Sequence, residues 1–401
     1  MTQQNPLPSP SFYSLGIAPK LLEILDRMKF TIPTPIQHKA IPIAIDGKDV
    51  MGIAQTGTGK TLAFGIPMVQ RLAQKPGRGL VLVPTRELAL QVGETLHKIG
   101  HPFGMRSAVL IGGASMYNQI EALRKNPRIL IATPGRLIDH LQQRNVRLNE
   151  VNVLVLDEAD RMLDMGFQPQ IERILHTVPK ERQTMLFSAT IPQEIMRIAA
   201  AYMKLPVSVE IAKSGTVAER VTQELFIVKQ EAKRELLGKL LQQYHGSVLL
   251  FSRTKIGAYK ITKALRTMGH PVAEIHSDRS LGQRREALEG FKSGKYRILV
   301  ATDIAARGID VRGIELVINY DLPDDTENYV HRIGRTGRAG HEGHAISFAT
   351  SDQRNDVQNI EKLMGSILPI SEHPEIPSER FAKPRVVFSS RRFRPSRKKY
   401  R

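Results

Sequence analysis

The sequence predicts an α/β protein made of two parallel-sheet lobes. Apolar runs typical of buried strands alternate with amphipathic segments typical of helices through most of the 401 residues. Such alternation favours parallel sheets with right-handed helical crossovers. A short polar stretch divides the alternation into two series, and a chain of this length is long enough for two or three domains. We therefore expect one lobe from each series.

The first series contains strand-like runs separated by helix-like segments such as residues 86–100. Ligands of such sheets bind at the carboxyl ends of the strands, so the short stretches that follow each run are the candidate sites. The runs are 49–54, 79–84, 128–133, 151–156 and 183–188.

The second series begins after AKSGTVA, a polar stretch typical of a linker. Its strand-like runs are 224–229, 247–252, 297–302, 316–320 and 345–350. The expected domains are an N-terminal domain over 1–211, a linker over 212–221, a C-terminal domain over 222–368 and a basic tail over 369–401.

The charge balance is strongly basic, with 58 Lys+Arg against 39 Asp+Glu, a net charge of +19. Such an excess favours a polyanionic partner, either nucleic acid or an anionic surface. From Arg380 onward there are ten basic residues and no acidic ones, a composition typical of disorder. We interpret this tail as a loose nucleic-acid contact; the alternative is a solubilising end.

Composition also excludes several classes of protein. No apolar run reaches the length of a membrane span, and the N-terminus has no secretory pattern. There are no cysteines, which excludes disulfides, thiol nucleophiles and Cys-based zinc sites, and fits a reducing compartment. We expect a cytoplasmic protein without a membrane partner.

A candidate phosphate-binding loop, AQTGTGKT, follows the first run. It matches the P-loop pattern G-x-x-x-x-G-K-[ST], except that Ala54 replaces the first glycine. Gly57 and Gly59 allow backbone N–H groups to point at phosphate oxygens, and the next helix adds its N-terminal partial charge. Lys60 would reach the β and γ phosphates, and the Thr61 hydroxyl would hold Mg²⁺. An ordinary turn is the alternative, but it does not explain GKT between a buried strand and a helix.

Three carboxylates, Asp157, Glu158 and Asp160, follow the buried run at 151–156. Asp157 lies where a carboxylate can meet the Mg²⁺ side of the P-loop, and the ion would offset its desolvation. Glu158 is then placed to orient or deprotonate an attacking water. A helix N-terminus that favours acids is the alternative. It explains each acid singly, but not their pairing with a P-loop in the same lobe.

With these motifs in order, and with D-E-A-D at 157–160, the chain resembles the DEAD-box ATP-dependent RNA helicases over roughly residues 12–365. The resemblance implies two RecA-like domains and an RNA-dependent ATPase that uses ATP and Mg²⁺ and locally unwinds short duplexes. The compact core with a short basic tail looks like the bacterial members.

The stretch KFTIPTPIQ resembles the family's Q motif, with Lys29 where glycine is common. The resemblance implies that Gln37 reads the adenine edge and that Phe30 stacks on the ring. Phe12 matches the isolated upstream aromatic residue; taken alone, Phe30 would be interpreted as core. The other predicted nucleotide contacts are Thr56, Gly57, Thr58, Gly59, Lys60 and Thr61, and in the second lobe Gly308, which permits close approach, and Asp310, which contacts the ribose.

Three stretches resemble the family's RNA-backbone motifs: PTRELA, Gly112-Gly113 and TPGR. PTRELA and TPGR each follow a strand and open a helix, where exposed N–H groups suit phosphates; plain helix capping, with Pro134 as the first helical residue, is the alternative. Backbone contacts do not read sequence, and aromatic residues for stacking are few, so we expect sequence-independent binding. The predicted contacts are Thr85, Arg86, Gly113, Thr133, Gly135, Arg136 and Thr302.

The resemblance to the family implies that the S-A-T stretch and HRIGRTGR take part in lobe closure. The hydroxyls of Ser188 and Thr190 are expected to donate to Asp160. His331 and Arg332 are expected to join the interlobe network.

Arg335 and Arg338 are the candidate arginine fingers on the γ-phosphate, whose developing charge suits a guanidinium group. A basic surface turn is the alternative. Where the family often has H-G-D and QxxR, Ser277 replaces the glycine, and Glu286 stands where we align the arginine. This weakens an RNA role for that stretch, with Arg284 as the substitute candidate.

Neither lobe holds a complete site, so hydrolysis requires closure, and ATP and RNA should each strengthen binding of the other. The main prediction is a monomeric RNA helicase acting on single-stranded or short duplex RNA, with ribonucleoprotein or ribosome-assembly factors as candidate partners. Two alternatives stay open: an ATP-gated RNA clamp or scaffold with little unwinding, and a DNA translocase.

Overall fold

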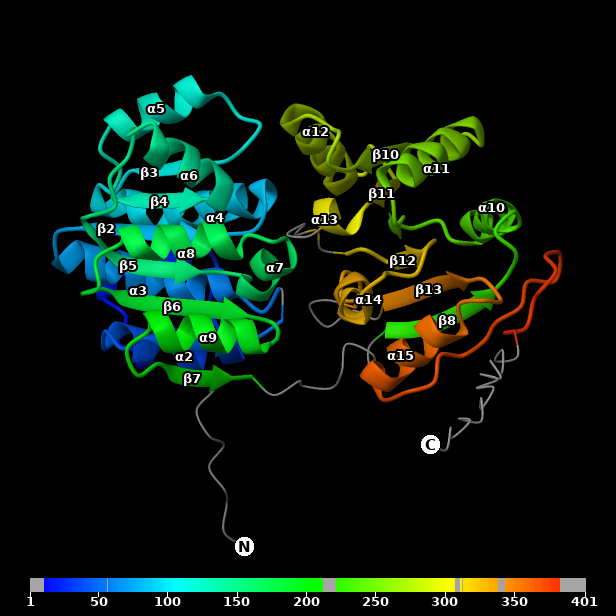
Figure 1. Ribbon diagram of the computed structural model, residues 1–401, viewed down its shortest axis with the longest axis horizontal. Coiled ribbons are helices and arrows are strands. Elements are labelled where there is room, and N and C mark those ends of the chain that lie inside the picture. Colours follow the sequence, from blue (N-terminus) through cyan, green and yellow to red (C-terminus); the bar gives the residue numbers. More distant parts are fainter. Residues whose placement is uncertain are drawn as a thin grey trace, which may run out of the picture.

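The computed structural model describes residues 11–55, 57–211, 221–306, 311, 313–337 and 343–382. It consists of two lobes that lie side by side, each built on a parallel β-sheet flanked by helices (Figure 1). The prediction of two parallel-sheet α/β lobes is confirmed.

The sheet of the first lobe has seven strands in the order β3-β4-β2-β5-β6-β1-β7. Every pairing in it is parallel. The strands are β1 (Val50–Ile53), β2 (Arg78–Leu82), β3 (Ser107–Leu110), β4 (Ile129–Ala132), β5 (Val151–Leu156), β6 (Gln183–Ser188) and β7 (Val207–Glu210).

The helices of this lobe begin at residues with ordinary capping chemistry. Proline is in the first turn of α1, α2 and α6, where its missing N–H costs nothing, and Thr85 accepts the Leu88 N–H at the start of α4. The helices are η1 (Phe12–Ser14), α1 (Pro19–Arg27), α2 (Pro35–Ile45), α3 (Lys60–Gln74), α4 (Arg86–Gly100), η2 (His101–Phe103), α5 (Met116–Arg124), α6 (Pro134–Gln142), α7 (Ala159–Asp164), α8 (Gln168–Thr177) and α9 (Gln193–Tyr202).

The sheet of the second lobe has six parallel strands in the order β10-β11-β9-β12-β13-β8. Its strands are β8 (Val221–Ile227), β9 (Val248–Phe251), β10 (Val272–Ile275), β11 (Ile298–Ala301), β12 (Leu316–Asn319) and β13 (Gly343–Ala349). Its helices are α10 (Lys233–Gln243), α11 (Lys255–Thr267), α12 (Leu281–Lys292), α13 (Asp303–Ala306), α14 (Thr326–Ile333) and α15 (Arg354–Met364).

Each lobe has two hydrophobic clusters, and the inward-facing residues of its strands divide between them. Both faces of each sheet are therefore covered, which is why most strands read as continuous apolar runs. In the described part of the chain, no helix combines the length and the apolar character that crossing a membrane requires.

The ten expected strands are all present, and β3, β7 and β10 were not expected. These three strands lack a long apolar run. In β3 buried and half-buried residues alternate, β7 has a single buried residue, and β10 contains the buried Glu274. Each of them lies at a sheet edge, where pairing on one side is enough.

The chain on either side of the second lobe differs in detail from the expected boundaries. Residues 212–220 of the predicted linker lie outside the described residues, and Val221 is the first residue of β8. Residues 369–382, assigned to the tail from the sequence, lie along the second lobe. The Leu225 N–H donates to Pro369 O, the Ser371 N–H to Leu225 O, and Ile376 is buried. Residues 383–401 lie outside the described residues.

Candidate active site between the two lobes

The P-loop connects β1 to α3, as the sequence predicts. Gly57 and Gly59 both adopt positive φ, 86° and 88°, which is the backbone freedom required of them. Lys60 opens α3; it is buried, and its Nζ donates to Ala54 O over 3.0 Å. Ala54 itself continues the strand, donating its N–H to Ser188 O, so this position does not require the usual glycine. Thr56 lies outside the described residues.

Gln37 links the Q motif to the P-loop. Its Oε1 accepts the Thr34 N–H at 2.9 Å and its Nε2 donates to Gly59 O at 2.9 Å, so both ends of the amide are engaged within the protein. A Cβ on Gly59 would come within 2.4 Å of that Nε2, so a side chain there would displace the amide. The adenine-reading role of Gln37 stays a prediction.

Lys29 shows how the end of α1 places Phe30. Its φ is 62°, and the N–H groups of Lys29 and Phe30 donate to Asp26 O and Leu25 O, the pattern of a Schellman motif. This left-handed position explains why glycine is common there in the family. Phe30 is half-buried beside the core, whereas Phe12 is fully buried in it.

The acids at the end of β5 are buried in contrasting environments. Burial raises the pKa of Asp157 to about 6, against the opposing charge of Lys60. Burial alone would also raise the pKa of Glu158, but the positive charges of Arg161, Lys60 and Arg335 together lower it. Glu158 adopts φ 52° and its Oε2 accepts a hydrogen bond from Arg161 Nη1 at 2.8 Å. An unusual backbone conformation at a buried carboxylate is typical of a functional site.

Asp160 connects these acids to the end of β6. Its Oδ2 accepts the N–H groups of Ala189 and Thr190, each at 3.0 Å, and the Thr190 hydroxyl at 3.3 Å. The hydrogen bond expected from Thr190 is therefore present. The one expected from the Ser188 hydroxyl runs the other way, because Ser188 Oγ accepts the Asp160 N–H at 3.3 Å.

The two lobes meet at Arg161 and His331. Figure 1 shows α7 on the side of the first lobe that faces the second, with α13 and α14 opposite. Arg161 Nη2 donates to His331 Nδ1 over 3.2 Å, and burial together with the Arg161 charge lowers the pKa of His331 to about 3. His331 is therefore a neutral acceptor. Arg335 is buried beside them, and its charge contributes to the pKa shifts of both Glu158 and His331.

Among the described residues, Arg332 has no partner in the first lobe, contrary to the interlobe contact predicted for it. Its guanidinium pairs with Asp303 at 2.6 Å and donates to Asn319 Oδ1 at 3.2 Å and Asp321 O at 2.6 Å, all within the second lobe. It also lies over the Phe251 ring. These contacts of Arg332 hold α14 to the rest of the second lobe and do not connect it to the first lobe.

The candidate RNA-backbone residues gather where β2, β3 and β4 end side by side. A Cβ on Gly113, whose φ is 74°, would come within 2.2 Å of Arg86 Nη1. The Gly112-Gly113 stretch is therefore in contact with PTRELA, which contains Arg86. Arg136 Nη1 donates to Ala114 O at 3.1 Å, which connects the third stretch, TPGR, to the residue that follows Gly113. Thr133 holds the N-cap position of α6 without a side-chain cap bond, and nothing lies within 4 Å of the place where Gly135 would carry a Cβ.

Arg284 makes a second contact between the lobes. Its Nη2 lies 2.8 Å from Glu87 Oε2, a residue of PTRELA, and both side chains are buried. Glu286, where the arginine was sought, is exposed and pairs with Lys295 in its own lobe. The interlobe role of Arg284 was missed from the sequence. Helical spacing signalled its burial, since Arg284 is four and seven residues before the buried Leu288 and Phe291.

The remaining predicted residues of the second lobe are only partly placed. Thr302 follows β11, is half-buried, and donates its N–H to Ile275 O. Gly308, Asp310 and Arg338 lie outside the described residues.

The residues present fit a Mg²⁺ ion. The raised pKa of Asp157 reflects a buried carboxylate whose nearby positive charge does not balance its desolvation. Carboxylate and hydroxyl oxygens are also the donors that Mg²⁺ prefers, and Thr61 supplies the hydroxyl on α3.

Comparison with known proteins gives consistent matches. The model of the DEAD/DEAH box helicase family matches residues 34–198, and that of the helicase conserved C-terminal domain matches residues 232–340. The chain is 42% identical over 368 residues to the ATP-dependent rRNA helicase RRP3 of Meyerozyma guilliermondii, covering 91% of this chain and 78% of that protein. It is 44% identical over 354 residues to the ATP-dependent RNA helicase CshA of Listeria monocytogenes, covering 88% and 68%.

Solved structures agree over both lobes. S. cerevisiae Dbp5 bound to RNA and ADP BeF3 aligns with a TM-score of 0.82 at 31% identity, over 90% of this chain and 96% of that one. Mss116p bound to ssRNA and AMP-PNP aligns with a TM-score of 0.83 at 27% identity, over 93% and 82%.

Proposed function

The chain belongs to the DEAD-box family of ATP-dependent RNA helicases and hydrolyses ATP, and from this premise we propose how its residues divide the work. The first lobe binds the nucleotide, the second supplies the arginine that completes the site, and RNA lies across both. The observation that carries this proposal is that Arg161 joins Glu158 of the first lobe, at 2.8 Å, to His331 of the second, at 3.2 Å, with Lys60 and Arg335 both close enough to lower the pKa of Glu158.

Nucleotide binding is assigned to the P-loop and the Q motif. Gly57, Thr58 and Gly59 would cradle the phosphates through backbone N–H groups, and Lys60 would reach the terminal phosphates. Thr61 and Asp157 would hold Mg²⁺, partly through water; when bound, Mg²⁺ neutralises charge on the phosphate oxygens. Adenine recognition is assigned to Gln37 with Phe30, and ribose contact to Asp310 beside Gly308.

Hydrolysis is assigned to Glu158 and the arginines of the second lobe. The lowered pKa of Glu158 supports an ionised carboxylate that can orient the attacking water, and proton acceptance from that water is also assigned to it. A guanidinium from Arg335, with Arg338 as its expected partner, would stabilise charge that develops on the γ-phosphate. Asp160, Thr190 and His331 would couple this centre to closure of the lobes.

RNA binding is assigned to backbone contacts on both lobes. The neighbouring strand ends that carry Arg86, Gly113 and Arg136 support a continuous phosphate-binding edge on the first lobe. Thr302 is the expected contact on the second. Because such contacts read no bases, we propose binding without strong sequence preference, to single strands or short duplexes, by a monomeric core.

The lobes of this proposal correspond to a first domain over 1–211 and a second beginning near 222. The end of β7 at Glu210 and the start of β8 at Val221 support a short connection between them. The basic segment after Ala382 is proposed as a loose nucleic-acid contact.

The deciding experiment compares ATPase stimulation by RNA and by DNA of the same sequence and length. We expect strong stimulation by RNA and little by DNA. Equal stimulation by both would contradict RNA as the partner. Duplex unwinding measured beside ATP-analogue-dependent RNA binding then separates a helicase from an RNA clamp with little unwinding.

A further inference from the structure

The two sheets share one strand order. Counted from β8, the order β10-β11-β9-β12-β13-β8 reads 3-4-2-5-6-1, and the first lobe reads the same with β7 added beyond β1. Each strand of the second lobe therefore has a counterpart in the first. The counterpart of β8 is β1, which leads into the P-loop, and the counterpart of β12 is β5, which leads into the acids.

A lysine and an aspartate occupy the corresponding places in the second lobe. Lys233 is the first residue of α10, as Lys60 is of α3, and both are buried. Asp321 follows β12 closely, as Asp157 follows β5. Lys233 Nζ lies 3.5 Å from Asp321 Oδ1 and donates to Tyr320 O over 3.0 Å.

The glycine loop has no counterpart. Residues 228–232, which connect β8 to α10, read VKQEA, and Ala232 caps the helix in a right-handed conformation where Gly59 is left-handed. A cavity of about 590 Å³ remains at the ends of β8, β9, β12 and β13, and Lys233 and Asp321 both line it. In the absence of a phosphate-binding glycine loop, the Lys233 ammonium group pairs directly with the Asp321 carboxylate.

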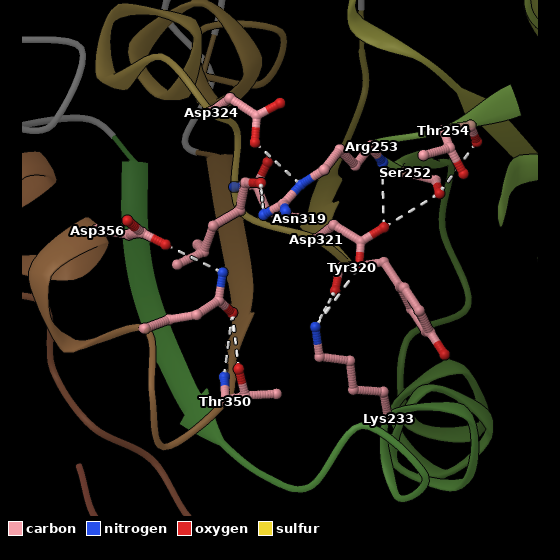
Figure 2. A network of polar contacts seen from close by, with 12 residues as sticks. Lys233, Ser252, Arg253, Thr254, Asn319, Tyr320, Asp321, Asp324, Thr350 and Asp356 are labelled. Atoms are coloured by element: carbon pink, nitrogen blue, oxygen red, sulfur yellow. Dashed lines mark hydrogen bonds and ion pairs between the residues drawn. The ribbon is translucent and has the colours of Figure 1, made fainter. Parts of the chain in front are cut away.

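Asp321 joins the ends of two strands through its side chain (Figure 2). Its Oδ2 accepts the Ser252 hydroxyl at 3.2 Å and the Arg253 N–H at 3.1 Å, both just beyond β9. Arg253 Nη2 returns a hydrogen bond to Leu322 O at 3.1 Å. The segment 320–322 is therefore held to β9 on one side and to α10 on the other.

The same segment anchors α14. Asp321 O accepts Arg332 Nη1 at 2.6 Å, and the Arg335 N–H donates to Arg332 O at 3.0 Å. His331, which meets Arg161 of the first lobe, directly precedes Arg332 in α14. A continuous set of contacts thus connects Lys233 to the residues at the lobe junction.

We propose that Lys233 and Asp321 are positioning residues that hold residues 331–335, the end of α14 and the two residues after it, in place for the interlobe site. The proposal rests on the role proposed above for Arg335. The Lys233 ammonium balances the Asp321 carboxylate, and the pair fixes the carbonyl that holds Arg332. Without the pair, the segment 320–322 loses the two contacts made by Lys233 Nζ and the two hydrogen bonds accepted by Asp321 Oδ2, so the carbonyl that holds Arg332 is less firmly fixed.

The test compares Lys233→Met and Asp321→Asn with Lys260→Ala, which lines the same cavity outside this network. Asp321→Asn keeps an oxygen to accept from Ser252 and Arg253 but removes the charge. We expect both network variants to lower the RNA-stimulated kcat between about tenfold and a hundredfold, because small misplacements of catalytic groups cost this much. KM for ATP should change less than about twofold, since most of the proposed nucleotide contacts lie on the first lobe. Lys260→Ala should match wild type.

Chemical rescue separates positioning from general destabilisation. Propylammonium added to folded Lys233→Ala should restore part of kcat, and it should do nothing for Asp321→Asn. Wild-type kcat in folded Lys233→Met and Asp321→Asn, or no rescue of folded Lys233→Ala, would overturn the proposal. Arg335→Ala is measured in parallel. Full activity there would refute the arginine role itself, whereas inactive Arg335→Ala beside active network variants would refute only this inference.

Discussion

At the scale of single residues, adjacent groups behave differently because their surroundings differ. Asp157 and Glu158 are neighbours and both are buried, yet the pKa of Asp157 is raised and that of Glu158 is lowered. The difference comes from Arg161, whose guanidinium is hydrogen-bonded to Glu158. One carboxylate is thereby favoured in its charged form, whereas burial favours the protonated form of the other.

Lys60→Ala tests the charge at the P-loop. Lys60 is buried beside both acids, so removing it takes away ground-state and transition-state stabilisation of phosphate. We expect kcat/KM for ATP to fall on the order of 10²–10³-fold, or about 2.7–4 kcal/mol. Steady-state ATPase assays check this. Lys75→Ala, at the exposed far end of α3, is the control and should match wild type. Wild-type rates in Lys60→Ala would contradict the assignment.

Lys29→Gly tests the strained cap of α1. A non-glycine residue at φ 62° pays a steric penalty that glycine avoids. We expect the free energy of unfolding to rise by about 1 kcal/mol, measured by urea denaturation. Lys29→Ala removes the charge but keeps the Cβ, and should give no comparable gain. A Lys29→Gly protein no more stable than wild type would show that another contact of Lys29 compensates.

At the scale of elements, helix α12 meets the start of α4 through a buried ion pair. The Arg284–Glu87 contact joins the lobes at the predicted RNA-binding edge. Glu87 Oε1 and Arg284 Nε have no hydrogen-bond partner in the described part of the chain, so the pair is only partly satisfied. Buried pairs of this kind are costly to break from one side.

Arg284→Met should loosen the closed state, because it leaves Glu87 without its partner. We expect ATP-analogue-dependent RNA affinity to fall by about 1.5–3 kcal/mol, with a smaller effect in the double variant with Glu87→Gln. Binding isotherms for the four proteins of this cycle measure the coupling. Glu286→Gln, on the exposed side of α12, is the matched control. Strictly additive losses would show that the two residues do not act through each other.

At the scale of the whole molecule, groups from both lobes meet in one buried junction, which we propose forms on closure. His331 is neutral there because burial and the nearby Arg161 charge lower its pKa to about 3. In an open arrangement its pKa should return toward its ordinary value of about 6.5. The open state then binds one more proton at His331 than the closed state does. The contribution of His331 to the stability of the closed state is therefore fully present above about pH 6.5 and is lost as the pH falls below that value.

The prediction is a loss of ATP-analogue-dependent RNA affinity of at most about tenfold per pH unit below 6.5. Affinities measured from pH 7.5 to 5.5 check it. Protonation of Asp157, whose pKa is about 6, would weaken the Mg²⁺ binding proposed for it over part of the same range. The part of the pH dependence of RNA affinity that is due to His331 is therefore the part that disappears in His331→Gln. An identical pH profile in His331→Gln would contradict the role of this histidine in closure.

The sequence by itself determined the two α/β lobes and placed the P-loop, the acids and the S-A-T stretch at strand ends. These features depend on local physics: apolar runs for buried parallel strands, glycine where the backbone turns left-handed, and caps at helix starts. The edge strands β3, β7 and β10 were missed because pairing on one side does not require a continuous apolar run.

Only the tertiary structure decided which charges meet. In the folded protein, Arg332 contacts residues of its own lobe and the Gln37 amide donates to Gly59 O. Arg284 pairs with Glu87, and Lys233 pairs with Asp321. Arg284 and Glu87, like Lys233 and Asp321, lie far apart in the chain, and the energy of a buried charge depends on its three-dimensional surroundings rather than on its sequence neighbours. Residue type and spacing could therefore nominate the groups of the site, while their pairing required the folded arrangement.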